Sequence, residues 1–171
     1  MEYIYEYFEE IVKPTVDDFL KDKTNIRKGR LAAIVLDHMR DYRVIQLDIK
    51  SEKRVSPTEV LLNEIKQECF DLVLIRDVCN ASKHCILKSY SKDQSNVKNP
   101  RNLTKTSDIR SEKNAGIFGA PFGTSEALFG ESNQVYMKFD QEITLKDKAV
   151  SSRFLHESIN EVLEYWQKAL Y

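Results

Sequence analysis

Glycine and cysteine are scarce in this sequence, and it has no long apolar run. Its 171 residues include five glycines and three cysteines. Neither a GxGxxG nor a P-loop pattern occurs, so a glycine loop that cradles phosphate is not expected. No apolar stretch approaches the length of a transmembrane helix, which predicts a protein without membrane contact. The odd cysteine count argues against a disulfide framework, and the lack of a CxxC pair gives a zinc site little support.

The sequence also lacks an excess of charge of either sign. The formal net charge is −1, so any attraction to nucleic acid must come from a local patch. The composition, with 42% apolar and 31% charged residues, is typical of a soluble globular domain. Residues 1–14 carry four glutamates and no basic n-region. They do not resemble a signal peptide, and a cytoplasmic location is expected.

Helical periodicity dominates the first half of the chain. Apolar residues recur at helical spacing over 2–21, where Pro14 is expected to kink or split the helix, and again over 30–48. The run Ser56-Pro57-Thr58-Glu59 has the form of a capping box and predicts a helix start. The pattern then stays helical to about residue 89. It fits one long helix or two helices with Asp71 as a new N-cap, and we favour two.

The second half of the chain differs in composition. Residues 88–114 hold seven Lys/Arg against three Asp/Glu and few apolar residues, which predicts a surface arm or loop. Residues 116–130 contain four of the five glycines and three phenylalanines, which favours a packed, irregular loop. VYMKFD and EITLKD alternate in period two around Asp140-Gln141, which predicts a β-hairpin. Residues 151–170 form an amphipathic closing helix that begins at Ser-Ser.

Together these patterns predict a mainly α single domain spanning residues 1–171. We expect a four- to five-helix bundle with a core formed by residues 2–88 and 150–171. The Gly/Phe-rich loop and the β-hairpin belong to an insertion at 89–149, before the C-terminal helix.

A polar stripe on the helix predicted over 72–87 is the main candidate for function. Winding this segment at 100° per residue places five polar side chains on an arc of roughly 120°. The five are Arg76, Asp77, Asn80, Lys83 and His84. Val73 and Leu87 share the arc, so the stripe fits a face partly buried against another helix or a second subunit. The alternative is the ordinary solvated face of an amphipathic helix.

The chemistry of this stripe suits phosphodiester cleavage. Histidine is well placed to transfer protons near neutral pH, and arginine clamps phosphate well. Neutral His84 would take the proton of a ribose 2′-hydroxyl, and Arg76 would offset charge on the phosphorane.

This Arg–polar–His motif on a helix of a mainly α chain resembles that of the all-α HEPN superfamily (higher eukaryotes and prokaryotes nucleotide-binding domains). The resemblance implies a metal-independent RNA endonuclease of a toxin or phage-defence type. It implies a homodimer with two motifs facing each other and no cofactor. It also implies His84 as the catalytic base, with Asn80, Arg76 and Asp77 as supporting groups.

The spacing departs from the family pattern. Seven residues separate Arg76 from His84, one more than the family's usual limit. If Asn80 is the polar residue that follows the arginine, Cys79 occupies the arginine position. These departures leave open a HEPN-like fold with a degenerate, inactive site.

Basic residues beside the stripe provide candidate RNA contacts. Those predicted to contact an RNA backbone are Lys83, Lys88, Lys92 and Arg101. The competing hypothesis is a non-enzymatic helical interaction or regulatory protein. Its stripe would be structural or a dimer contact, and the 116–130 loop would dock a protein partner.

Histidine and cysteine side chains outside the stripe have simpler interpretations. His38 lies on the apolar face of the second helix and fits a core histidine. A weaker alternative pairs His38 and His84 with Asp77 or Asp41 as a divalent metal site, although no HExxH-type spacing supports it. His156 is expected at the surface. The three cysteines are expected to be small buried hydrophobes.

Overall fold

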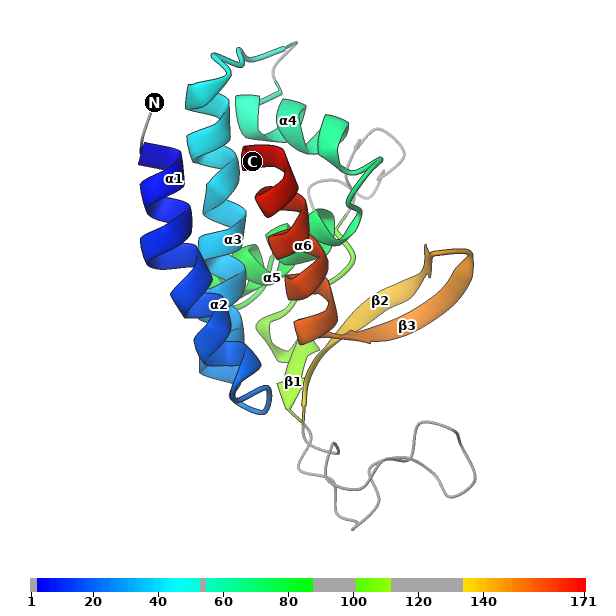
Figure 1. The fold of residues 1–171 in the computed structure, drawn as a ribbon. Coiled ribbons are helices and arrows are strands. Elements are labelled where there is room, and N and C mark those ends of the chain that lie inside the picture. Colours follow the sequence, from blue (N-terminus) through cyan, green and yellow to red (C-terminus); the bar gives the residue numbers. More distant parts are fainter. Residues whose placement is uncertain (1–2, 53–54, 88–100, 112–133) are drawn as a thin grey trace, which may run out of the picture.

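The computed structural model describes residues 3–52, 55–87, 101–111 and 134–171, and it is mainly helical (Figure 1). A small antiparallel sheet precedes the C-terminal helix, which confirms the predicted mainly α class and a β-hairpin before that helix. The helices are α1 Tyr3–Tyr7, the π-helical η1 Phe8–Val12, α2 Lys13–Leu20, α3 Ile26–Gln46, α4 Pro57–Ile65, α5 Asp71–Lys83, the 3-10 turn η3 Thr106–Asp108 and α6 Leu155–Leu170. The strands are β1 Ile109–Ser111, β2 Val135–Leu145 and β3 Lys148–Phe154.

Pro14 does not split the first predicted helix. It lies at the start of α2, directly after the π-helical turn η1, and the chain stays helical from Tyr3 to Leu20. A proline inside a helix lacks an N–H and crowds the carbonyl four residues earlier. The wider π turn before Pro14 accommodates that crowding.

Helix α3 starts earlier than the sequence pattern predicts. Asn25 caps it by accepting a hydrogen bond from the Lys28 backbone N–H at 3.2 Å. Gly29 therefore lies inside the helix, where it permits close packing. A Cβ atom there would lie 2.8 Å from Leu155 Cδ2 and 3.0 Å from Phe19 Cε2.

The region from 56 to 87 forms two helices, as favoured, but its details differ. The Ser56 hydroxyl caps α4 by accepting from the Glu59 backbone N–H at 3.3 Å. Phe70, not Asp71, is the N-cap of α5, because the Asp71 carboxylate faces α6 and pairs there with Ser158. The prediction of a helix over 72–87 is wrong at its C-terminal end.

Helix α5 ends at Lys83, and the backbone of His84 is extended. The following residues pair with the segment near Thr104 instead. The Leu87 N–H donates to the Thr104 carbonyl at 2.7 Å, and the Thr106 N–H donates to the Cys85 carbonyl at 3.1 Å. This pairing satisfies backbone groups that a longer helix would have satisfied internally.

The sheet has the order β1-β2-β3, and its hairpin turns at a different place from the one predicted. β2 runs through Asp140-Gln141 to Leu145, and the turn consists of Lys146 and Asp147. Both turn residues have positive φ, 47° and 65°, as in the two-residue turns that match strand twist. Ser151 and Ser152 therefore belong to β3, and α6 starts at Leu155 rather than at Ser-Ser.

The described part of the basic segment is more ordered than a surface arm. Residues 101–111 include η3 and β1, and Leu103 and Ile109 are buried in the core. The Gly/Phe-rich loop at 116–130, like Lys88 and Lys92, lies outside the described residues.

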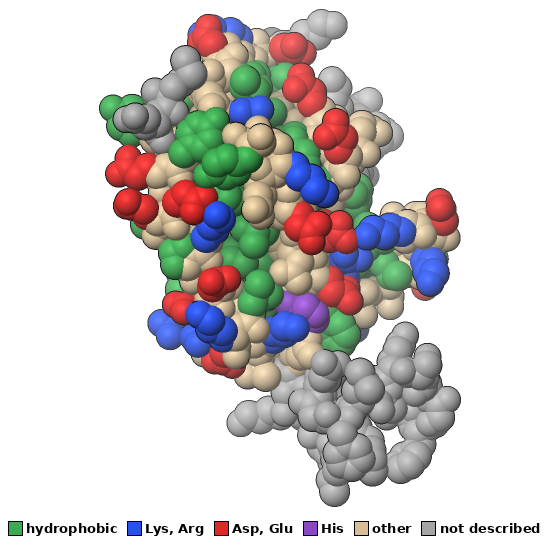
Figure 2. All heavy atoms as spheres, in the orientation of Figure 1, with side chains coloured by type: hydrophobic (Ala, Val, Ile, Leu, Met, Phe, Trp, Pro, Cys, Tyr) green, Lys and Arg blue, Asp and Glu red, His purple; other side chains and the backbone are tan. Residues whose placement is uncertain are grey.

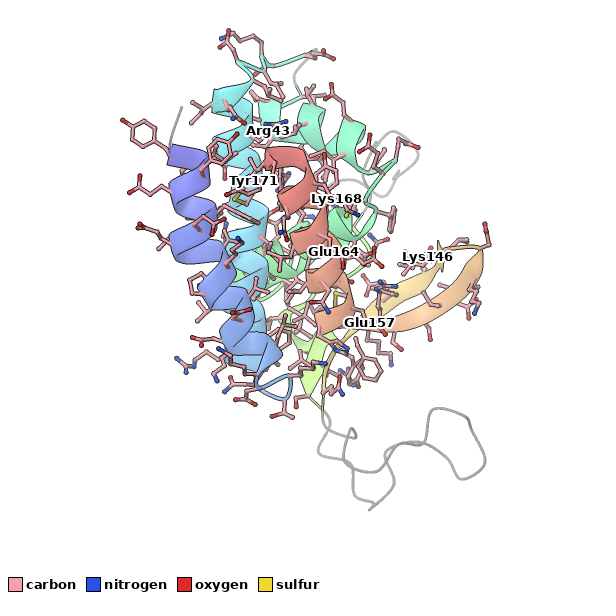
Figure 3. All side chains as sticks on the ribbon, viewed as in Figure 1. Arg43, Lys146, Glu157, Glu164, Lys168 and Tyr171 are labelled. Carbon is pink, nitrogen blue, oxygen red and sulfur yellow. The ribbon has the colours of Figure 1, made fainter. Side chains whose placement is uncertain are left out.

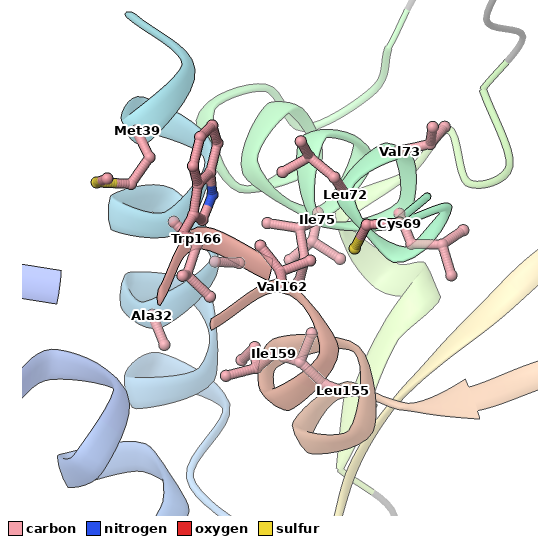
Figure 4. Packing of buried hydrophobic residues seen from close by; sticks show 14 of the residues in the cluster. Ala32, Met39, Cys69, Leu72, Val73, Ile75, Leu155, Ile159, Val162 and Trp166 are labelled. Carbon is pink, nitrogen blue, oxygen red and sulfur yellow. The ribbon is translucent and has the colours of Figure 1, made fainter. Parts of the chain in front are cut away.

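The core forms around α5, whose residues 71–79 are all buried. α3 packs on one side of α5 and α6 on another. Figure 4 shows Val162 and Trp166 of α6 between Leu72 and Ile75 of α5 and the α3 backbone. This central position of α5 also determines what surrounds the polar stripe.

Candidate functional site

The first two residues of the stripe are buried as an ion pair. Arg76 is 5% exposed and Asp77 0% exposed. Arg76 Nε and Nη2 donate to Asp77 Oδ1 at 2.9 and 2.7 Å. The expectation that the stripe packs against another part of the protein is confirmed for these two residues.

Residues of α3 and α4 extend this pair into a network of charges. The Glu59 carboxylate lies 3.5 Å from Arg76 Nη1 and 3.7 Å from Arg40 Nη1. Arg40 in turn donates through Nε to Asp37 Oδ1 at 2.9 Å, and both residues are buried. Two guanidinium groups therefore share three carboxylates, which gives the buried charges the partners that they need.

The Asp77 carboxylate also holds a segment that is distant in the sequence. Its Oδ2 accepts from the Asn102 backbone N–H at 2.8 Å and from Asn102 Nδ2 at 3.1 Å. Burial raises the pKa of Asp77 above its ordinary value, although Arg76 and Asn102 both act to lower it. The carboxylate thus anchors residues 101–108 to α5.

Cys79 occupies the arginine position in one alignment with the HEPN motif, and it is fully buried. Its thiol interacts with the side chains of Asp37 and Lys83. Burial and the adjacent Asp37 charge raise the pKa of Cys79 to about 12. A protonated thiol at this position cannot supply the positive charge that an arginine would bring to a phosphate.

The far end of the stripe is accessible to solvent. Lys83 and His84 are exposed and Asn80 is half-buried. His38 of α3 lies beside this end, with Nε2 3.4 Å from Lys83 Nζ. Because α5 ends at Lys83, His84 does not continue the arc of Arg76, and more than two helical turns separate the two residues.

The structure therefore divides the predicted site residues into two groups. Arg76 and Asp77 lie together in the buried network, while Lys83 and His84 lie at the open end of α5, with Asn80 between them. Half-buried Arg101 precedes the anchored Asn102, and Lys88 and Lys92 are outside the described residues.

The sequence reasoning missed the groups that surround Arg76 and Asp77. Asp37 and Arg40 are three residues apart on α3, and their spacing offered a local signal. Glu59 and Asn102 gave no signal, because their roles depend on tertiary contacts. The described residues contain no group of three His, Cys, Asp or Glu side chains able to hold a metal ion.

A second polar cluster joins the base of the hairpin to the helices. The Ser158 hydroxyl donates to Asp71 Oδ1 at 2.5 Å, and both side chains are buried. Arg153 Nε lies 3.0 Å from the same carboxylate oxygen and donates to Ser158 Oγ at 3.0 Å. Burial raises the pKa of Asp71 above its ordinary value. This cluster fixes the end of β3 against α5 and α6.

Beside this cluster lies an open, charged cleft. It has a volume of about 350 Å³, and its lining residues are Lys146, Arg153, Glu157, Asn160, Glu161 and Glu164. Figure 2 shows acidic side chains of α6 next to basic side chains of the hairpin in this area. Its residues were not among those predicted to form a site.

Comparison with known proteins assigns neither a family nor a function to the chain. Of the helices in the described ranges, none is both long and apolar enough to cross a membrane. Comparison of the chain with protein-family models, with curated proteins and with solved structures finds no match.

Proposed function

We propose that this chain is a non-catalytic helical interaction protein in which Arg76 and Asp77 stabilise the fold. The supporting observation is the burial of the Arg76 guanidinium, which donates two hydrogen bonds to Asp77 and lies 3.5 Å from Glu59. The three free cysteines of the chain fit a reducing, cytoplasmic location.

The chemistry of a nuclease explains why this burial matters. A guanidinium that stabilises a phosphorane must contact the phosphate oxygens directly. Contact with Arg76 would require displacing Glu59 or Asp77, and would leave a buried carboxylate without its counter-charge. The arrangement thus favours a structural role for the first half of the stripe.

A second candidate function is the HEPN-like RNA endonuclease, acting as a homodimer. One observation favours it: Lys83, His84 and His38 lie at the accessible end of α5, where Lys83 Nζ is 3.4 Å from His38 Nε2. In this candidate His84 acts as the base, while Lys83 takes over the phosphate contact and Asn80 supports it. A second copy would bring another His84 to the same substrate.

One experiment separates the two candidates. Purified wild-type protein, His84→Ala and His156→Ala are incubated with a labelled single-stranded RNA without added metal, and full-length RNA is measured over time. His156→Ala is the matched control, because half-buried His156 lies on α6, away from the stripe.

RNA that stays intact with all three proteins supports the non-catalytic interaction protein. Cleavage by wild type and His156→Ala but not by His84→Ala refutes that proposal in favour of the endonuclease. Sedimentation of the same samples tests the dimer that the endonuclease requires.

A further inference from the structure

The β2–β3 hairpin is fixed at its base. β2 pairs with β1 over Val135–Met137, and Arg153 on β3 contacts Asp71 and Ser158 in the buried polar cluster. Farther along β2, the Asp140 N–H donates to the Asn102 carbonyl at 2.8 Å. The hairpin is therefore tied to the body of the protein up to about Asp140.

The pairing of the two strands is interrupted beyond this point. Lys138 pairs with Ser152 and Ile143 with Val150, so the register shifts between them. Such irregularities bend a strand and break the hydrogen-bond ladder locally. The interruption separates the fixed base from residues 141–150, which we name the strap.

The strap packs against the rest of the protein mainly through three apolar side chains. Of its residues only Leu145 is buried, with Ile143 and Val150 partly so, and the rest are exposed. Figure 1 shows the hairpin projecting to one side of the helical body, beyond the start of α6. A segment held by so few buried side chains can open without global unfolding.

One ion pair links the tip of the strap to α6. Lys146 Nζ lies 2.5 Å from Glu161 Oε1, and the two side chains are 72% and 41% exposed. Glu161 lies one turn after Glu157 and almost one turn before Glu164, so three carboxylates form a ridge along α6. Figure 3 labels Lys146 on the hairpin and Glu157 and Glu164 on α6.

These observations lead to one inference about movement. We propose that the strap opens and closes over the charged cleft beside α6, with the burial of Leu145 and the Lys146–Glu161 ion pair holding it closed. The strap tip and α6 line that cleft together, so the strap controls its width. Because the ion pair is exposed to solvent, salt weakens it and the strap opens more often.

A cysteine at the strap tip reports opening. In the variant Leu145→Cys/Cys85→Ser the new thiol is covered when the strap is closed, and the exposed native thiol is removed. The remaining Cys69 and Cys79 are buried, so they react only slowly with Ellman's reagent. The rate of modification at the reporter thiol then measures how often the strap opens.

Charge reversal tests the ion pair itself. Lys146→Glu should raise the modification rate about fivefold, in line with an exposed pair. The matched control Lys148→Glu makes the same charge change two residues away, outside the ion pair, and should leave the rate unchanged. The double variant Lys146→Glu/Glu161→Lys should restore the slow modification rate. Added salt should accelerate modification of the Leu145→Cys/Cys85→Ser protein that keeps the native Lys146 and Glu161.

Three results would overturn the proposal. Equal rates for Lys146→Glu and Lys148→Glu would show that the ion pair does not hold the strap. A reporter that reacts only at the rate of global unfolding would show that the hairpin is a fixed part of the fold. Wild-type amides at 141–150 that exchange as fast as those of an unstructured chain would show that the strap is never closed. Amide hydrogen exchange at 141–150 in chains without the reporter gives a second measure, with faster exchange expected only for Lys146→Glu.

Discussion

Replacing Arg76 with alanine should strongly destabilise the protein, and the structure sets the size of the effect. The fully buried Asp77 carboxylate accepts four hydrogen bonds, two from Arg76 and two from Asn102. The substitution removes two of these and the only positive charge that contacts Asp77 in the described ion pairs. It also removes the Arg76 contact with Glu59.

Removing one partner of a buried ion pair costs about 3–5 kcal/mol, because the other charge stays buried and uncompensated. A typical domain is stable by only about 5–15 kcal/mol, so this loss is a large fraction of the total. For a chain of this length it should lower the Tm by roughly 6–20 °C. Arg76→Lys keeps the charge but cannot place two N–H groups on one oxygen, so an intermediate loss is expected.

Urea unfolding measured by tryptophan fluorescence provides the assay, because the single tryptophan, Trp166, is completely buried. The matched control is Lys83→Ala, which removes a cation from the exposed end of the same helix and should cost less than about 1 kcal/mol. If Arg76→Ala stays within about 1 kcal/mol of wild type, Arg76 does not stabilise the fold and the structural interpretation of the stripe fails.

Three further predictions concern packing and titration. In native protein at pH 8, exposed Cys85 should react with Ellman's reagent within minutes. Burial raises the pKa values of Cys69 and Cys79 to about 11 and about 12, so these two thiols should react only on unfolding, and three fast thiols would contradict this. Gly29→Ala should cost about 1–3 kcal/mol in urea unfolding, since its Cβ would overlap packed side chains, and a gain in stability would refute the close packing. Burial raises the pKa of Asp71 in the folded protein above 3.8. The contribution of Asp71 to stability is therefore largest below pH 3.8 and declines as the pH rises through the folded-state pKa. The unfolding free energy measured against pH should lose this decline in Asp71→Asn.

The helices were predictable because burial of one helical face leaves a periodic trace in the sequence. The capping pattern at Ser56 correctly predicted the start of α4. The break before α5 was also expected, but for the wrong reason, because Phe70 and not Asp71 is the N-cap. The end of α5 was not predictable from the sequence. No glycine or proline lies near Lys83 to signal a helix end. The helix ends there because the chain continues into a backbone pairing of Leu87 with Thr104.

The hairpin shows a similar limit. Alternation predicted two strands, but the polar pair Asp140-Gln141 looked like a turn and is instead inside β2. The turn consists of Lys146 and Asp147, without the glycine or asparagine that usually marks positive φ. Local composition therefore predicted the element but not its turn.

The polar stripe shows why periodicity alone cannot identify a functional site. Winding the sequence correctly placed Arg76 and Asp77 on one side of a helix, but it gave no information about what covers that side. Glu59 arrives from the preceding helix and Asn102 from 25 residues farther along the chain. These partners can be found only from the tertiary structure.

We infer that the buried charges determine where the 101–108 segment attaches. An apolar face at Arg76 and Asp77 could bury a loop in several registers, because apolar contact is not directional. The Asp77 carboxylate accepts both the backbone and the side-chain N–H of Asn102, and the Asn102 carbonyl accepts from Asp140 of β2. A shift by one residue would leave the buried carboxylate short of donors, at a cost of about 1–3 kcal/mol for each unsatisfied group. The ion pair thus links α5 to the sheet in a single arrangement, which is a structural reason for placing charges in the core.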